Sequence, residues 1–341
     1  MTELTISAGG ASCPVIIGTG LTERLAAELS TRFPGFRRLL LCDSSLLPLW
    51  GARLSQQLGA KLLSFPAGEA SKTREVKAQL EDRMLERGFG RDTVLICLGG
   101  GVCLDLGGFL AATYQRGIPC VYVPTTALAL VDAAIGGKCA VNTPAGKNMI
   151  GLFRMPELVA ADLRYLTTLP EREYRAGLAE GLKLGFVLDR ELLAFFEANT
   201  GRILAKEPEP LEEFVRMSVR TKARVVEEDF LDRGLRRALN YGHSYGHAVE
   251  TALGYTALHG ECVAEGMRYA ARKARDLGLC TPEWSDFQEA LLDRLGLVRP
   301  DLTQAVPELF AAALGHDKKN EGGRAVWVLS PGPGQCVFHE E

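Results

Sequence analysis

A buried strand that runs directly into three glycines constrains the fold of this chain most. Residues Thr93-Val-Leu-Ile-Cys-Leu98 form a continuous apolar run, Gly99-Gly100-Gly101 follow, and a helical pattern covers 102–114. An apolar strand without alternation is typical of a parallel sheet that is covered on both faces. Glycines let a backbone approach a phosphate closely, and the next helix offers free amide groups there. The segment predicts a dinucleotide pyrophosphate site, with a tight glycine turn as the alternative.

The pattern around this segment indicates two domains. Expected strands cover 38–42, 60–65, 93–98 and 120–123, and expected helices cover 21–32, 72–87 and 102–114. After about residue 160 helical patterns dominate, over 171–188, 190–199, 210–230, 235–253, 261–277 and 285–295, with a late strand at 325–329. We therefore expect an α/β protein with a Rossmann-like, parallel-sheet nucleotide-binding domain over 1–160 and a mainly α-helical domain over 161–341.

Composition narrows the class of protein. The chain has 341 residues, 47% hydrophobic residues and a net charge of −3. Such a balance gives no basic excess for nucleic acid, and no apolar run approaches the roughly 20 residues of a membrane span. The first residues lack a signal-peptide pattern, and the nine cysteines form no CxxC pair, so that most are expected to be small buried residues in a reducing cytosol. We expect a cytoplasmic protein that binds neither nucleic acid nor membranes.

Three of the five histidines lie close together, at His243, His247 and His259. The first two are four residues apart and share one face of a helix. Glu250 and Glu261 are near them, and histidines with carboxylates are typical zinc ligands. A pair at this spacing, taken alone, is more often part of a helix surface or a core. The pattern thus indicates a candidate metal site without fixing its ligands.

A second unusual segment spans 131–151, which is rich in glycine and carries Lys138 and Lys147 without a clear helical or strand period. Such loops usually bind a ligand. Other basic residues stand at Arg116, Lys183, Lys222, Arg236 and Lys318. Each is most often a solvated charge, but together they would suit a small polyanionic substrate. Asp43, Glu69 and Lys72 follow strand ends, where they could contact a nucleotide or merely cap helices.

These segments together resemble the 3-dehydroquinate synthase family. The resemblance rests on separate blocks that span residues 66 to 319 in the family's order: Leu98-Gly-Gly-Gly-Val-Cys-Leu-Asp105-Leu-Gly-Gly-Phe, Ala112-Thr-Tyr-Gln-Arg116-Gly, Val123-Pro-Thr-Thr126, 132–151, Ala179-Glu180-Gly-Leu-Lys183, Lys222-Ala-Arg-Val-Val-Glu-Glu-Asp229, 235–247, His259-Gly-Glu261 and Asp317-Lys-Lys319. Agreement over so many blocks is specific. Departures from the family pattern occur at Ser45, Ala133-Ala134, Cys139 and Asp232.

The resemblance implies a role for each matching position. Glu180, His243 and His259 would bind zinc, or cobalt in its place, while His247 would lie near the substrate rather than on the metal. NAD would contact Asp43, Glu69, Lys72, Gly100, Gly101, Val102, Asp105, Thr125, Thr126, Lys138, Lys147, Thr167 and Thr168. The catalytic and substrate-binding residues would be Arg116, Asp132, Lys138, Asn148, Lys183, Lys222, Arg236, Asn240, His247 and Lys318.

The implied activity is a phosphate-eliminating lyase of the shikimate pathway. It would convert 3-deoxy-D-arabino-heptulosonate 7-phosphate to 3-dehydroquinate by transient oxidation, elimination, reduction, ring opening and an aldol step, with NAD regenerated in each cycle. A homodimer is also implied. Two alternatives stay open, namely another sugar-phosphate cyclase and a metal-dependent polyol or glycerol-phosphate dehydrogenase of similar fold. A non-catalytic NAD- or phosphate-binding protein would not require Glu180, Lys183 and His259, which are all present.

Overall fold

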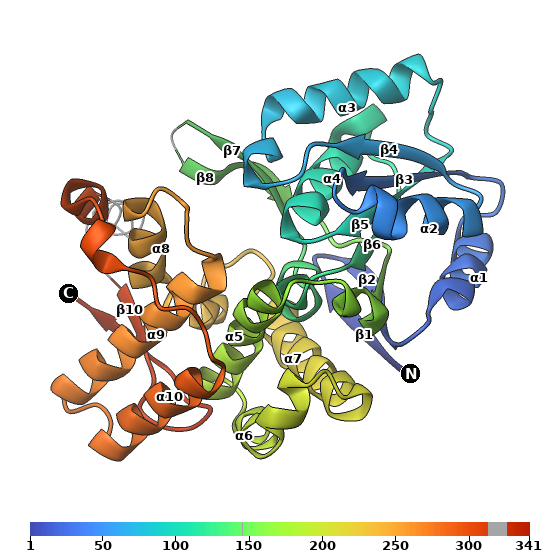
Figure 1. Ribbon diagram of the computed structural model, residues 1–341. Coiled ribbons are helices and arrows are strands. Elements are labelled where there is room, and N and C mark those ends of the chain that lie inside the picture. The colour runs from blue at the N-terminus through green and yellow to red at the C-terminus, as the bar shows by residue number, and fades with distance from the viewer. Residues whose placement is uncertain (145, 313–325) are drawn as a thin grey trace. The chain divides into compact units, whose positions relative to one another are not determined.

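The computed structural model describes residues 1–144, 146–312 and 326–341. It divides into an N-terminal unit of residues 1–169 and 226–231 and a C-terminal unit of residues 170–225 and 232–341 (Figure 1). Lys318, which the resemblance assigns to the substrate, lies outside the described residues. Within the described part of the chain, no helix is long and apolar enough to cross a membrane.

A seven-stranded sheet organises the N-terminal unit. Its strands are β1 (Thr2–Ala8), β2 (Ala11–Gly18), β3 (Arg37–Asp43), β4 (Lys61–Phe65), β5 (Thr93–Gly99), β6 (Cys120–Pro124) and β9 (Leu158–Asp162). They lie in the order β1-β2-β9-β6-β5-β3-β4. All neighbouring pairs are parallel except the hairpin of β1 and β2. The predicted parallel sheet is therefore confirmed, while the sequence patterns did not reveal β1, β2 and β9.

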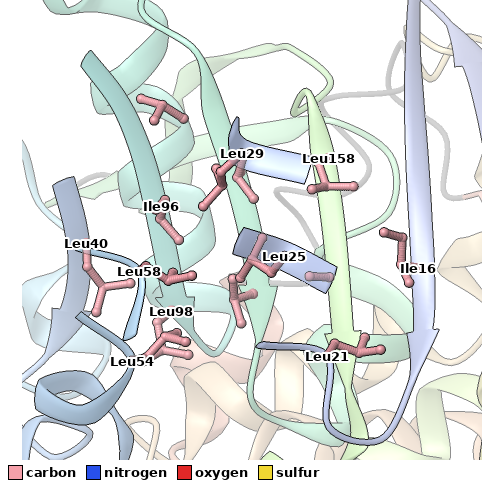
Figure 2. Close-up of a cluster of buried hydrophobic side chains, with 14 of the residues drawn as sticks. Ile16, Leu21, Leu25, Leu29, Leu40, Leu54, Leu58, Ile96, Leu98 and Leu158 are labelled. Atoms are coloured by element: carbon pink, nitrogen blue, oxygen red, sulfur yellow. The ribbon is translucent and has the colours of Figure 1, made fainter. Parts of the chain in front are cut away.

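Helices on both faces explain why the strands are apolar throughout. On one face, α1 (Thr22–Arg32) and α2 (Ala52–Gln57) pack with strand residues such as Leu40 and Ile96 (Figure 2). On the other face lies α4 (Gly101–Thr113), where a Cβ atom on Gly107 would overlap Cys97 Sγ. The helix α3 (Arg74–Glu86) follows β4. Alternate strand residues thus face different helices, and both sets must be apolar.

The segment expected as a loop over 131–151 is largely a hairpin, so this expectation was wrong. Strands β7 (Lys138–Thr143) and β8 (Gly146–Phe153) pair antiparallel, with Lys138 opposite Phe153. Apolar and polar residues do not alternate regularly here. Met149 and Ile150 are consecutive apolar residues, and both are exposed. The period-2 signal of a half-buried strand is consequently absent.

Helices make up most of the C-terminal unit. They are α5 (Glu171–Val187), α6 (Arg190–Leu204), α7 (Pro208–Glu228), α8 (His243–Ala252), α9 (His259–Asp276) and α10 (Pro282–Arg294), and the last residues of α7 group with the N-terminal unit. Strands β10 (Val326–Leu329) and β11 (Val337–Glu340) pair antiparallel. The mainly helical character expected from the sequence is confirmed.

The single helix expected over 235–253 is wrong in one respect. The structure has a 3₁₀ helix over Leu235–Asn240 and then α8, which begins at His243. Gly242 separates them with a φ of 78°, a left-handed conformation that favours glycine. The break sets the direction of α8 and hence of both its histidines.

The boundary between the units lies at residues 169/170, nine residues later than the expected 160/161. Residues after β9 are tied to the sheet. Asp162 accepts hydrogen bonds from the backbone amides of Gly20 and Leu21, at 3.0 and 2.8 Å. Trp50 Nε1 donates to Thr168 Oγ1 at 2.7 Å. A short 3₁₀ helix over Leu163–Thr167 follows β9, and the α-helices of the C-terminal unit begin with α5, after these contacts end.

Candidate nucleotide and metal sites

The ends of β3 and β5 form the first candidate site, within the N-terminal unit. The two strands are neighbours, with Cys42 opposite Leu98, so that Asp43 and Gly99 end adjacent strands. From here β3 connects to β4 on one side, while β5 connects to β6 on the other. In open α/β sheets, ligands bind outside the carboxyl ends of strands at such a reversal of strand order.

The triple glycine lies at this position. Gly100 precedes the first residue of α4, and the backbone amide of Leu104 donates to the Gly100 carbonyl oxygen at 3.1 Å. No side chain caps the start of α4. A Cβ atom on Gly100 would lie 3.0 Å from Thr126 Cγ2, so only glycine fits without movement. Uncapped amides and the positive end of the helix dipole can hold a phosphate here.

Several predicted cofactor residues form one polar network beside α4. Lys72 Nζ donates to Asp105 Oδ2 and to Asn148 Oδ1, both at 2.5 Å. Glu69 Oε1 accepts from Asn142 Nδ2 at 2.7 Å. Burial raises the pKa of Asp105, and the nearby Lys72 ammonium opposes that rise only in part. The network brings together Glu69, Lys72 and Asp105, which are predicted to contact NAD, and Asn148, which is predicted to contact the substrate.

Asn142 connects this network and was not among the predicted site residues. Its side-chain oxygen accepts a hydrogen bond from the backbone amide of Asn148 at 2.9 Å. Its backbone amide donates to the Lys72 carbonyl oxygen at 2.7 Å. Its place between Lys138 and Lys147 in the glycine-rich segment was the available signal.

Three predicted cofactor residues use their polar atoms locally. Asp43 Oδ1 accepts from the backbone amide of Ser45 at 2.9 Å. The hydroxyls of Thr167 and Thr168 donate to backbone carbonyl oxygens of the preceding turn, at 2.7 and 3.2 Å. Since a hydroxyl has a single proton, these threonines could only accept a hydrogen bond from a ligand.

The remaining predicted residues of this unit lie on its turns and hairpin. Arg116 is exposed and has a φ of 70°, next to Gln115 at 48°. Consecutive left-handed residues other than glycine are strained, and such strain is concentrated at functional sites. Lys138 begins β7 and is exposed, whereas Asp132 lies half-buried in the short π-helix Ala129–Ala133.

The second candidate site gathers Glu180 from α5, His243 and His247 from α8, and His259 from α9 in the C-terminal unit. Glu180 Oε1 lies 3.7 Å from His243 Nε2 and 3.5 Å from His259 Nε2. One ring nitrogen from each of the three histidines lies within 4.8 Å of the others. Ligands about 2.0–2.1 Å from a tetrahedral zinc ion are separated by roughly 3.4 Å. The spacing of Glu180, His243 and His259 therefore fits a metal ion.

Both predicted histidine ligands are held by their second nitrogen. His243 Nδ1 lies 3.2 Å from the Tyr241 carbonyl oxygen, and His259 Nδ1 lies 3.2 Å from Glu250 Oε2. Each contact favours the tautomer with a proton on Nδ1, which leaves Nε2 available toward Glu180. Such outer partners are typical of metal-bound imidazoles.

Close approaches at glycine bring the three helices together. A Cβ atom on Gly260 would overlap the Ala176 carbonyl oxygen of α5, and one on Gly266 would overlap the Gly242 carbonyl oxygen. A Cβ atom on Gly246 would likewise lie only 2.8 Å from the Cys262 carbonyl oxygen. Only backbones without side chains at these points can lie so close. The glycines thereby place Glu180, on α5, within reach of the histidines.

The charges in the cluster are strongly interdependent. Burial would raise the pKa of Glu180, but Lys183, whose Nζ is 2.6 Å from Oε2, and the imidazoles hold it well below its usual range. Burial and the Lys183 charge lower the pKa of His243. Burial also opposes protonation of His259, yet hydrogen bonds to Glu180 and Glu250 raise its pKa to about 10. Without a metal, the His259 proton balances the two carboxylates.

Comparison with known proteins decides the family. Residues 62–176 match the model described as "3-dehydroquinate synthase N-terminal", and residues 177–320 match "3-dehydroquinate synthase C-terminal". A 3-dehydroquinate synthase from Symbiobacterium thermophilum is 43% identical over 331 residues, which cover 95% of this chain and 92% of that protein. This chain belongs to the 3-dehydroquinate synthase family.

Solved structures of related cyclases share the fold of this family member. A 2-deoxy-scyllo-inosose synthase complexed with carbaglucose-6-phosphate, NAD⁺ and Co²⁺ has a TM-score of 0.92 and 27% identity, covering 99% of this chain and 96% of that one. A 2-epi-5-epi-valiolone synthase from Streptomyces hygroscopicus with NAD⁺ and Zn²⁺ bound has a TM-score of 0.87 and 29% identity, covering 96% and 92%. Both are cyclases that bind NAD⁺ and a divalent metal.

The remaining predicted residues of the C-terminal unit fall into two groups. Lys183, Lys222 and Arg236 are buried, with 1%, 5% and 2% of their surface exposed. Asn240 and His247 are exposed. Buried cations are costly unless they meet negative charge. For Lys183 that charge is the Glu180 carboxylate, whose Oε2 lies 2.6 Å from Lys183 Nζ.

Proposed function

We propose that this family member converts 3-deoxy-D-arabino-heptulosonate 7-phosphate to 3-dehydroquinate and phosphate, a reaction of the shikimate pathway. The observation that carries the proposal is the cluster of Glu180, His243 and His259 with buried Lys183 beside it, in a chain whose whole length resembles synthases. The function is therefore that of a lyase, and NAD is regenerated in each cycle.

The N-terminal unit supplies the proposed NAD site. The pyrophosphate would lie at the start of α4, against Gly100, Gly101 and Val102, and the network of Glu69, Lys72 and Asp105 would contact the adjoining part of the cofactor. Thr125 and Thr126 follow β6, the next strand in the sheet, and Thr125 donates its amide to the Gly99 carbonyl oxygen at 3.0 Å. Asp43, Lys138, Lys147, Thr167 and Thr168 remain predicted contacts.

The proposed metal ligands are Glu180, His243 and His259, with zinc as the expected ion and cobalt as a substitute. Bound metal would polarise the C5 oxygen of the substrate, and bound NAD would take up and later return the C5 hydride. His247 is left for the substrate. Its ring is exposed, whereas both His243 and His259 approach the buried Glu180.

The chain's own cations would bind the two ends of the substrate. Lys183, Lys222 and Arg236 can donate to a carboxylate or a phosphate, and Arg236 offers a planar fork that suits either group. Asn240 and His247 would donate to polar groups of the sugar. Arg116, Asp132, Asn148 and Lys318 are assigned to substrate binding on the family pattern alone. Fixed positive charges would also stabilise the enolate that forms on removal of the C6 proton and collapses as phosphate leaves.

A comparison of substrates distinguishes this proposal from another cyclase activity. We expect phosphate release from heptulosonate 7-phosphate and at most about one ten-thousandth of that rate from glucose 6-phosphate, because a substrate without a carboxylate leaves buried donors unpaired. The measurement is inorganic phosphate released by zinc-loaded protein with NAD⁺. Faster release from glucose 6-phosphate would contradict the proposal.

A homodimer is the expected assembly, which sedimentation would measure.

A further inference from the structure

One buried carboxylate in the C-terminal unit contacts a proposed metal ligand but is not itself among the proposed ligands. Glu250 lies on α8 with 5% of its surface exposed. Its Oε2 is 3.2 Å from Nδ1 of His259, on the far side of that ring from the Nε2 that approaches Glu180. A buried carboxylate is costly unless it is hydrogen-bonded, so the contact is a specific one.

The position of Glu250 along α8 explains how it reaches this ring. His243, His247 and Glu250 are spaced at i, i+4 and i+7, and such residues lie along one face of a helix. That face meets the beginning of α9: the His259 ring centroid is 5.4 Å from that of His243 and 5.7 Å from that of His247. This face of α8 therefore carries His243, a proposed metal ligand, and Glu250, whose carboxylate holds the second proposed histidine ligand, His259.

We propose that Glu250 is a positioning residue for the metal. It accepts the Nδ1–H proton of His259, fixes the tautomer that leaves Nε2 free to bind the ion, and makes that nitrogen a stronger donor. The inference rests on the proposed metal site, and Glu250 itself does not touch substrate, cofactor or metal.

A purely structural role would have a different consequence. If the carboxylate only joined α8 to α9, replacing it would lower the stability of the unit. The metal affinity of the folded protein would then stay the same. Glu265 on α9 provides the comparison, because it is 8% exposed and pairs with Arg268 and Arg272 at 3.5 and 3.4 Å. It is six residues from His259 and contacts other partners.

The test measures metal affinity directly. Zinc dissociation constants are determined by chelator competition for the full-length protein and for the Glu250→Ala, Glu250→Gln and Glu265→Gln variants. Cobalt-loaded samples give visible absorption spectra, which report ligand geometry at the ion. NAD⁺ titration and thermal unfolding check that each variant is folded.

We expect Glu250→Ala to weaken zinc binding by about 10–100-fold and to alter the cobalt spectrum. Glu250→Gln keeps an acceptor oxygen and should lose less, while Glu265→Gln should bind zinc within about twofold of the original protein. Zinc affinity within twofold in both Glu250 variants, with an unchanged cobalt spectrum, would overturn the inference. If Glu250→Ala does not fold, the glutamine variant decides alone. Failure of the proposed function is a separate result, since it would appear as absent phosphate release or absent zinc binding in the unaltered protein.

Discussion

Individual residues in the C-terminal unit set the chemistry of the proposed metal site. Glu180 is 1% exposed and contacts a lysine and two imidazoles, so its negative charge depends on cations close by. A divalent ion bound by Glu180 would add positive charge beside that of Lys183. The site is therefore expected to respond strongly to the loss of any one member.

Replacing His259 should weaken zinc binding without weakening NAD⁺ binding. We expect His259→Ala to reduce zinc affinity more than the roughly 10–100-fold typical of an outer-shell partner, and to abolish turnover. NAD⁺ affinity should stay within about twofold, because the proposed nucleotide contacts belong to the other unit. Metal content by atomic spectroscopy and NAD⁺ titration measure the two effects. Full turnover in a zinc-free variant would show that the metal assignment is wrong.

The raised pKa of His259 predicts that zinc binding releases a proton. The pKa of about 10 means that metal-free protein carries this proton at pH 8, and a bound ion must displace it. We expect about one proton released per zinc at pH 8, and affinity that rises up to about tenfold per pH unit below pH 10. Calorimetry in buffers of different ionisation enthalpy gives the number of protons released per zinc ion bound. Binding at pH 8 without proton release would contradict the prediction.

The same shift fixes the sign of a stability effect in the metal-free protein. The folded-state pKa lies above the ordinary value of 6.5, so the protonated ring favours the folded state. The stabilisation is complete below about pH 6.5 and is lost as the pH rises through about 10. Zinc-loaded protein should not show this loss over the same range. Thermal unfolding of both forms between pH 7 and 10 makes the comparison.

At the level of elements, glycines determine how closely α5, α8 and α9 approach. Spacing in the sequence predicts that His243 and His247 share a face, which α8 confirms, but it cannot predict that Glu180, on a different helix, joins them. That contact depends on backbone packing at Gly242, Gly260 and Gly266. The family resemblance assigned Glu180 where helical periodicity could not, and the helix expected over 235–253 missed the break at Gly242.

A methyl group at Gly260, the residue after His259, should therefore disturb the proposed metal site through the packing of α9 against α5. We expect Gly260→Ala to lower stability by about 1–3 kcal/mol, because its Cβ atom would overlap the Ala176 carbonyl oxygen. Zinc affinity should fall as α9 moves from α5. The matched control is Gly201→Ala in α6, where a Cβ atom meets nothing within 4 Å and should raise stability by about 0.5–1 kcal/mol. Equal stability changes in the two variants would contradict this explanation.

At the level of the whole molecule, two compact units carry the two proposed cofactor sites. The parallel sheet and the glycine turn were predictable because apolar strands and glycine have local signatures. The edge hairpin β1–β2 was missed although β1 alternates regularly, as at exposed Thr5 and buried Ile6; its partner β2 is buried at every residue from Cys13 to Gly18 and has no alternation. The β7–β8 hairpin carries exposed apolar residues and gives no period. The predicted site residues Lys72, Asp105 and Asn148 share one hydrogen-bonded network, whereas Asn142 was recognised only from its hydrogen bonds within it.

The central claim is that NAD⁺ is regenerated while phosphate leaves the substrate. Zinc-loaded protein is mixed with heptulosonate 7-phosphate and a small excess of NAD⁺ over protein, and phosphate, dehydroquinate and NADH absorbance are followed in the same sample. We expect many equivalents of phosphate and dehydroquinate per NAD⁺, with NADH never exceeding the protein concentration. NADH that accumulates in step with substrate loss, without dehydroquinate, would identify a dehydrogenase and contradict the proposed function.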